Sequence, residues 1–198
     1  MNSFRAAEQI DASFLVPLVA ESSGGVWPAV WKAFAQNGES VEKAGARYLA
    51  NPENNLSVDN TILVESNGIR IGAMISYREN PVVGKSDESR ARSPLPRDLF
   101  DALQPYRELS DPNSLFISEL CLLSEARGQG LGTRLLEHAR ESAAEQSLPR
   151  VTLRVFSANT GAVRLYERFG FRQISELPIL PHPDIQVAGS VILMSHSL

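Results

Sequence analysis

The chain has 198 residues, of which 43% are apolar and 21% charged, and its formal net charge is −4. This length and composition are typical of a soluble globular domain, and a net negative chain lacks the basic face of most nucleic-acid binders. No stretch reaches the ~20 apolar residues of a membrane span, and the N-terminus lacks the features of a signal peptide. The single cysteine, Cys121, excludes an intrachain disulfide and a thiolate metal cluster. We therefore expect a cytoplasmic protein without a bound metal.

The first third of the chain favours one strand followed by helices. Residues 3–8 are predicted to form a short strand. Asp11 is a suitable N-cap for a first helix, in which Pro17 introduces a kink. Apolar residues at helical spacing predict a second helix over residues 26–35, and Ser40 is a suitable N-cap for a third.

A hairpin and an irregular segment follow. Asn67-Gly68, between predicted strands at 61–65 and 69–77, is the strongest short hairpin signal. Regularity is then lost over residues 80–114, apart from a short helix near 97–104. This connection is longer than usual, so we interpret it as an insertion, and its charged part, 85–92, is expected to be a mobile loop.

The most informative stretch is residues 115–138. Residues 115–123 are apolar and have the length of a buried strand, whereas the residues from Leu131 onward show helical spacing. The turn between them contains Gly128, Gly130 and Gly132. A strand that ends in a glycine-rich turn and opens a helix presents unpaired backbone N–H groups and the positive end of the helix dipole. The sequence therefore predicts a phosphate-binding loop.

The spacing of these glycines excludes two common nucleotide loops. A Rossmann fingerprint requires G-x-G-x-x-G, and a P-loop ends in Gly-Lys-Ser/Thr, but here the order is Arg-Gly-Gln-Gly-Leu-Gly. A second patterned stretch follows at residues 149–171. Its alternating part predicts a strand, Ser157 or Asn159 can cap the next helix, and Gly170 ends that helix.

The remaining chain predicts two strands, over residues 171–177 and 187–195. The segment between them contains Pro178, Pro181 and Pro183, which exclude regular structure. The complete order of elements indicates a mixed α/β (α+β) fold with a largely antiparallel central sheet flanked by helices.

These two motifs, Arg-x-x-Gly-x-Gly after a strand and Asn-x-x-Ala-x₃-Tyr-x₃-Gly-Phe downstream, together resemble the cofactor site of the GNAT superfamily of acyl-CoA-dependent N-acyltransferases. The resemblance covers nearly the full chain and implies one GNAT-like domain over residues 1–198. It also implies direct acetyl transfer from acetyl-CoA to a primary amine of a small molecule or protein. The sequence departs from the usual family pattern at Ser124, where proline is common, and at Ala126, where a larger residue is common. Neither change removes a donor N–H group.

The resemblance assigns cofactor contacts to the end of the strand, the glycine loop and the second motif. The diphosphate is expected at the loop amides, and the pantetheine arm is expected to pair with the strand backbone. The residues implied in acetyl-CoA binding are Leu120, Leu122, Arg127, Gly128, Gln129, Gly130, Leu131, Gly132, Thr133, Asn159, Ala162 and Tyr166.

Two residues are candidates for catalysis. Tyr166 stands at the tyrosine position of the family pattern and is expected to protonate the leaving thiolate, although a core aromatic has the same spacing. Glu119 lies on the strand where a buried carboxylate would have a raised pKa and act as a base. Alternatively, Glu119 faces solvent or pairs with an arginine, and the base is His182 or a chain of waters.

Other residues have a structural as well as a functional interpretation. Cys121 lies in an apolar run, so we expect it to pack in the core rather than carry an acyl group. Trp27 and Trp31 either line an acceptor pocket or pack in the core. The competing hypothesis for the whole protein is a non-catalytic domain that binds acyl-CoA. The acceptor and the donor's acyl length are open, and edge strands near the C-terminus allow a homodimer.

Overall fold

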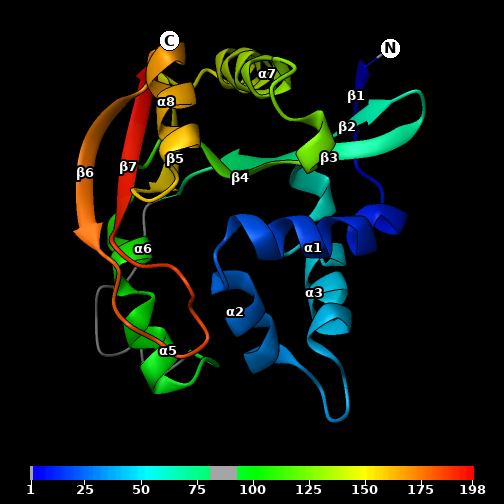
Figure 1. Ribbon diagram of the computed structural model, residues 1–198, viewed down its shortest axis with the longest axis vertical. Coiled ribbons are helices and arrows are strands. Elements are labelled where there is room, and N and C mark those ends of the chain that lie inside the picture. The colour runs from blue at the N-terminus through cyan, green and yellow to red at the C-terminus, as the bar shows by residue number, and fades with distance from the viewer. Residues whose placement is uncertain (1, 81–92) are drawn as a thin grey trace.

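The computed structural model describes residues 2–80 and 93–198. Its described strands form one seven-stranded sheet in the spatial order β1-β2-β3-β4-β5-β7-β6 (Figure 1). The strands are β1 (Asn2–Ala6), β2 (Thr61–Ser66), β3 (Ile69–Arg78), β4 (Leu115–Leu122), β5 (Arg150–Phe156), β6 (Arg172–Pro178) and β7 (Ser190–Ser197). The helices are α1 (Ala12–Ser22), α2 (Val26–Phe34), α3 (Val41–Ala50), α5 (Arg97–Ala102), α6 (Gln104–Glu108), α7 (Leu131–Glu145) and α8 (Thr160–Phe169).

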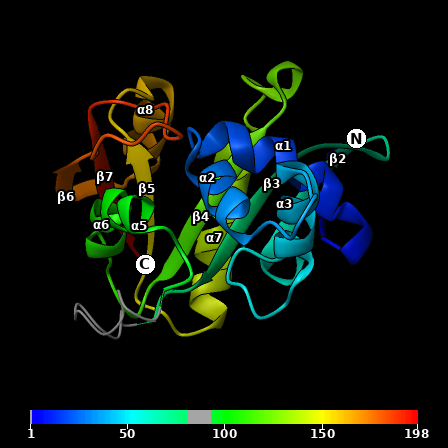
Figure 2. The ribbon, with the colours of Figure 1, turned by 90° about the horizontal axis from the view of Figure 1, so that it is seen from below.

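The sheet is antiparallel except at its centre, where β4 and β5 run parallel. This parallel pairing is short, because only Leu115, Phe116 and Ile117 of β4 pair with β5. Beyond Ile117 the two strands separate, and their ribbons diverge in Figure 2. The edge of β4 that faces β5 is therefore free of sheet pairing over residues 118–122.

Helices cover both faces of the sheet (Figure 1). On one face, α7 and α8 bury Leu131, Leu135 and Tyr166 against β4 and β5. On the other face, α1 and α3 pack Leu15 and Leu49 against β3 and the end of β4. Each fully buried leucine stabilises the fold by about 1.5–3 kcal/mol, so both layers hold the central strands in place.

A third apolar cluster joins segments that are far apart in the sequence. Val30 of α2 packs with Leu99 and Leu103 from the α5–α6 region and with Ile185 from the connection between β6 and β7. Both ribbon views place that connection beside α2 (Figures 1 and 2). The expected insertion therefore contributes α5 and α6, which pack against α2 in this cluster. Its charged part, 85–92, lies outside the described residues.

Most local predictions are confirmed. The hairpin forms at Asn67-Gly68, Ser40 accepts a hydrogen bond from the Lys43 amide, and Gly170 ends α8 with a positive φ of 108°. The prediction that the Asp11 side chain caps α1 is wrong. Its carboxylate makes no side-chain cap to α1 and instead forms ion pairs with Arg5 and Arg70. These two partners come from β1 and β3, so sequence spacing gave no sign of them.

The last strand begins at Ser190 rather than at residue 187, because Gly189, with φ of 95°, turns the chain before it. The proline-rich connection before it contains only an isolated bridge between His182 and Ile185, as its composition predicts. Among the helices of the described chain, none has the length and apolar character needed to cross a bilayer.

Candidate active site

A cavity of about 750 Å³ lies where β4 and β5 separate. Its floor is made by residues 117–120 of β4 and 153–156 of β5, and α2 and α8 contribute to its walls. Glu119 and Tyr166, the two predicted catalytic residues, both line this cavity, as do Leu120, Asn159 and Ala162. The fold thus brings the middle of β4 and the second sequence motif to one space.

Glu119 is buried, with 8% of its surface exposed. The Trp27 indole Nε1 donates to Oε1 at 2.8 Å, and the Ser22 hydroxyl donates to Oε2 at 2.5 Å. Burial raises the pKa of Glu119 to about 7, because removing water from the carboxylate outweighs these two hydrogen bonds and the charge of Arg154. Glu119 therefore neither faces solvent nor takes its hydrogen bonds from an arginine, and it titrates in the range that suits a base.

Tyr166 is buried on α8 and packs against Phe171, with ring centroids 5.8 Å apart. Burial is the main cause that raises the pKa of its phenol, and the nearby Cys121 and Glu119 raise it further. The phenol is therefore protonated at neutral pH and available as a donor. Tyr166 therefore packs in the core and also lines the cavity, and its role as an acid stays a prediction.

Cys121 packs in the apolar layer under α1 and is 7% exposed, which confirms the prediction of core packing. Burial raises the pKa of its thiol, followed by the effect of the neighbouring Glu119. Since the thiolate is the nucleophilic form, this environment disfavours an acyl-cysteine intermediate.

The glycine loop has the backbone expected of an anion site. Gly128 and Gly130 have φ of 75° and 77°, a region that glycine adopts without strain, and Gly130 is the N-cap of α7. The Arg134 amide donates to the Gly130 carbonyl at 3.2 Å. The amides of Leu131, Gly132 and Thr133 precede this bond and have no partner within the helix. A Cβ on Gly132 would lie 2.9 Å from the Leu165 side chain of α8, so a larger residue here would require that leucine to shift.

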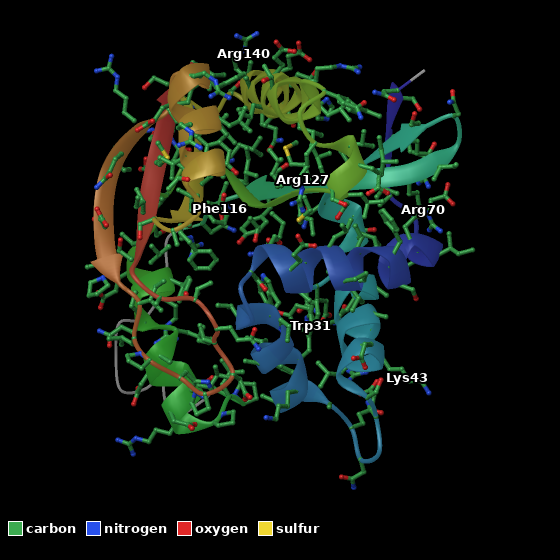
Figure 3. The ribbon with its side chains drawn as sticks, in the orientation of Figure 1. Trp31, Lys43, Arg70, Phe116, Arg127 and Arg140 are labelled. Carbon is green, nitrogen blue, oxygen red and sulfur yellow. The ribbon has the colours of Figure 1, made fainter. Side chains whose placement is uncertain are left out.

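The side chains of the loop are tied to the protein. Arg127 is 56% exposed and lies between the end of β4 and α1 (Figure 3), where it donates to the Leu122 carbonyl and pairs with Glu21 at 2.8 Å. Gln129 donates to the Glu125 carbonyl at 2.8 Å. These contacts hold the side chains of Arg127 and Gln129 against the protein. The loop itself, residues 127–133, does not line the cavity and lies beyond it along the same strand.

Asn159 is the N-cap of α8, because its Oδ1 accepts a hydrogen bond from the Ala162 amide at 3.2 Å. Capping is thus confirmed for Asn159 rather than for Ser157, and a cofactor contact stays a prediction. His182 lines a separate pocket beside Lys32 and Asp98, and its Nδ1 accepts a hydrogen bond from the Asp184 amide. This placement separates His182 from Glu119 and disfavours it as the base.

The two tryptophans of α2 have different environments. Trp27 lines the cavity, whereas Trp31 is 1% exposed and its ring lies against Gly45 of α3, where an added Cβ would approach to 2.7 Å. The suggestion that Trp31 borders an acceptor pocket is therefore wrong, since the ring fills the space between two helices. Ser22 is a site residue that the sequence analysis missed, because Ser22-Ser23-Gly24-Gly25 has the composition of an ordinary turn.

The geometry agrees with comparisons to known proteins. Residues 33–171 match the acetyltransferase (GNAT) family, so the chain belongs to this family. Over 119 residues it is 38% identical to N-alpha-acetyltransferase 40 of Saccharomyces cerevisiae, a match that covers 57% of this chain and only 40% of the yeast protein.

Solved structures show the same fold. A mosquito arylalkylamine N-acetyltransferase like 5b superposes with a TM-score of 0.70 and 16% identity, with both chains fully covered. A streptothricin acetyltransferase-type protein of Bacillus anthracis, solved in complex with acetyl coenzyme A, gives a TM-score of 0.50 and 15% identity over 70% of this chain and 61% of that one. Within the described residues, no group of three or more His, Cys, Asp and Glu side chains is arranged to hold a metal.

Proposed function

We propose that this protein transfers an acetyl group from acetyl-CoA directly to a primary amine, with Glu119 as the base and Tyr166 as the donor to the leaving sulfur. The observation that carries this proposal is the placement of both side chains on one cavity at the divergence of β4 and β5. Membership of the acetyltransferase (GNAT) family supports the reaction class.

Acetyl-CoA fits the groups present along β4 and the loop. Residues 118–122 of β4 have a free edge toward β5, where backbone N–H and C=O groups can pair with the amides of a pantetheine arm. The helix-start amides of Leu131, Gly132 and Thr133 suit a diphosphate. The thioester would then lie at the Leu120 end of the cavity, near Glu119 and Tyr166.

The chemistry follows from the protonation states. An amine enters as an ammonium ion and gives one proton to the Glu119 carboxylate, which is partly ionised at neutral pH because its pKa is about 7. The neutral nitrogen attacks the thioester carbon and the C–S bond breaks. The second proton of the nitrogen then replaces the one that Tyr166 gives to the leaving thiolate, and Glu119 releases its proton to solvent. The products are the amide, CoA thiol and one net proton.

Tyr166 acts on the leaving group. Because its pKa is raised, the phenol is a weaker acid than an ordinary tyrosine, so it first stabilises the developing thiolate as a hydrogen-bond donor and then supplies the proton. The buried Cys121 takes no part in this sequence of bonds, so the transfer is direct.

The test is thiol release from acetyl-CoA with a panel of primary amines, together with calorimetric titration of acetyl-CoA and of a pantetheine fragment that lacks the diphosphate. We expect turnover that depends on both Glu119 and Tyr166, and binding that requires the diphosphate. Tight binding without turnover for any amine would favour the alternative function, a non-catalytic domain that binds acyl-CoA. No binding of acetyl-CoA would refute both.

A single domain over residues 1–198, the cytoplasmic location and the homodimer stay predictions. The dimer has a structural candidate in β6, the last strand of the sheet order, whose residues 172–176 are exposed. Sedimentation velocity at several protein concentrations would test it.

A further inference from the structure

A row of aromatic side chains leads from the surface to Glu119. Phe34 of α2 is 37% exposed and its ring centroid lies 5.7 Å from that of Tyr48 on α3, which lies 5.7 Å from the ring of Trp27. Trp27 in turn donates its indole hydrogen to Glu119. All three rings line the cavity, so a molecule that approaches Glu119 from this side passes their faces.

Further aromatic residues line the cavity from other elements. Tyr106 of α6 packs at a 6.2 Å centroid distance from Phe156 of β5, and Phe100 of α5 and Phe116 of β4 add two more rings. The lining is therefore aromatic over segments from both halves of the chain. Such surfaces bind flat apolar groups and attract cations to their faces.

Charged groups of the cavity other than Glu119 already have partners. The buried Glu79 accepts a hydrogen bond from the Asp111 amide at 3.0 Å and lies 3.7 Å from the Arg154 guanidinium. Arg154 also stacks over Phe116 at 4.3 Å and donates to the Tyr106 carbonyl. Arg107 lies 3.8 Å over the Phe100 ring. Glu119 alone among these carboxylates accepts its hydrogen bonds only from neutral donors, Ser22 and Trp27.

The connection between β6 and β7 lies outside the cavity lining and is joined to the α1–α2 turn, in which Ser23 lines the cavity. The Gln186 amide donates to the Gly24 carbonyl at 3.0 Å, and Asp184 pairs with Lys32 at 3.0 Å. An added Cβ on Gly25 would lie 2.5 Å from the Asp184 carbonyl, so the backbones are in close contact. These contacts join the α1–α2 turn to the β6–β7 connection. An extended peptide laid between those two segments would have to break them.

We propose that the acceptor is a small primary amine carried on an aromatic body. This inference rests on the proposed acetyl transfer and specifies its substrate. The ammonium group of the acceptor reaches Glu119, which takes its proton, and the ring of the acceptor packs among Trp27, Phe34 and Tyr48. A polycation lacks the body that these rings contact, and an extended peptide that lay between the α1–α2 turn and the β6–β7 connection would have to break the contacts that join them.

The test compares kcat/KM for 2-phenylethylamine, ethylamine, spermidine and a five-residue peptide with a free α-amine, at saturating acetyl-CoA. We expect 2-phenylethylamine to exceed each of the other three by about tenfold or more, the scale of one or two lost aromatic contacts. Equal or greater kcat/KM for spermidine or the peptide overturns the proposal. Absence of turnover with every amine would instead contradict the proposed function.

Variants separate ring recognition from general damage. Tyr48→Leu and Phe34→Leu keep an apolar side chain of moderate size and remove a ring face, while Lys43→Ala changes an exposed residue on the same helix as Tyr48. We expect the leucine variants to lower kcat/KM for 2-phenylethylamine several-fold more than kcat/KM for ethylamine, and Lys43→Ala to change neither. An equal loss for both amines, at an unchanged melting temperature, would refute recognition by these rings.

Discussion

Replacing Glu119 by Gln should make the protein more stable at neutral pH while removing the base that we propose. Glutamine keeps the shape of the side chain, its oxygen can still accept from Trp27, and its amide can donate to Ser22. What it removes is a buried negative charge. Enzymes commonly retain such groups at the expense of stability because the chemistry requires them.

The magnitude follows from the pKa. Burial moves the pKa of Glu119 from 4.5 to about 7, and each tenfold change in an acid dissociation constant corresponds to about 1.4 kcal/mol. Because the folded-state pKa is raised, the folded protein holds this proton more tightly than the unfolded chain does. The resulting stability is fully present below pH 4.5 and is lost as the pH rises to about 7. The wild type should therefore lose roughly 3 kcal/mol relative to Glu119→Gln across this window.

Urea denaturation of both proteins at several pH values between 4.5 and 8 measures this difference directly. We expect the free energy of unfolding of Glu119→Gln to rise relative to the wild type as the pH rises, and then to level off above pH 7. The matched control is Glu167→Gln, which removes an exposed carboxylate from α8. A difference between Glu119→Gln and wild type that does not change with pH would refute the claim that Glu119 is buried with a raised pKa.

Three further predictions concern the proposed reaction. Tyr166→Phe keeps the packing on Phe171 and removes the hydroxyl donor. Steady-state kinetics should therefore show kcat reduced by about 10²–10⁴-fold with KM little changed. An unchanged kcat would exclude Tyr166 as the acid. The pH profile of kcat/KM should fall as the pH drops through about 7, as Glu119 becomes protonated, and a flat profile from pH 6 to 8 would remove Glu119 as the base. Gly130→Ala places a side chain at φ of 77°, which costs about 1–2 kcal/mol of backbone strain. The melting temperature should therefore fall, and calorimetry should show weaker acetyl-CoA binding. Gly38→Ala, with φ of 75° and open space around it, is the control for the strain alone.

The local sequence was sufficient to predict features that depend on contacts between residues close together in the chain. Asn67-Gly68 made the hairpin predictable, because both residues adopt positive φ readily. Gly130 and the apolar spacing after it marked the start of α7, and Asn159 caps α8 through a contact only three residues away. From such segments in order, the mixed sheet and the glycine loop before α7 follow.

Tertiary structure decided which side chains share an environment. Glu119 is held by Ser22, 97 residues away, and by Trp27, 92 residues away, and nothing in the local pattern around Glu119 indicates these donors. Trp27 and Trp31 lie one helical turn apart on α2, yet one lines the cavity and the other fills the space against Gly45. Their roles depend on which helix packs where.

The sequence by itself determined the order of elements, the glycine loop and the family resemblance, because turns, caps and periodicity are properties of neighbouring residues. Only the tertiary structure decided that β4 and β5 part after Ile117, that Glu119 loses its water, and that aromatic rings from α2, α3, α5 and α6 line one cavity. Burial and long-range contacts arise when segments distant in the chain exclude water from one another. The raised pKa of Glu119 and the shape of the cavity are therefore properties of the packed molecule.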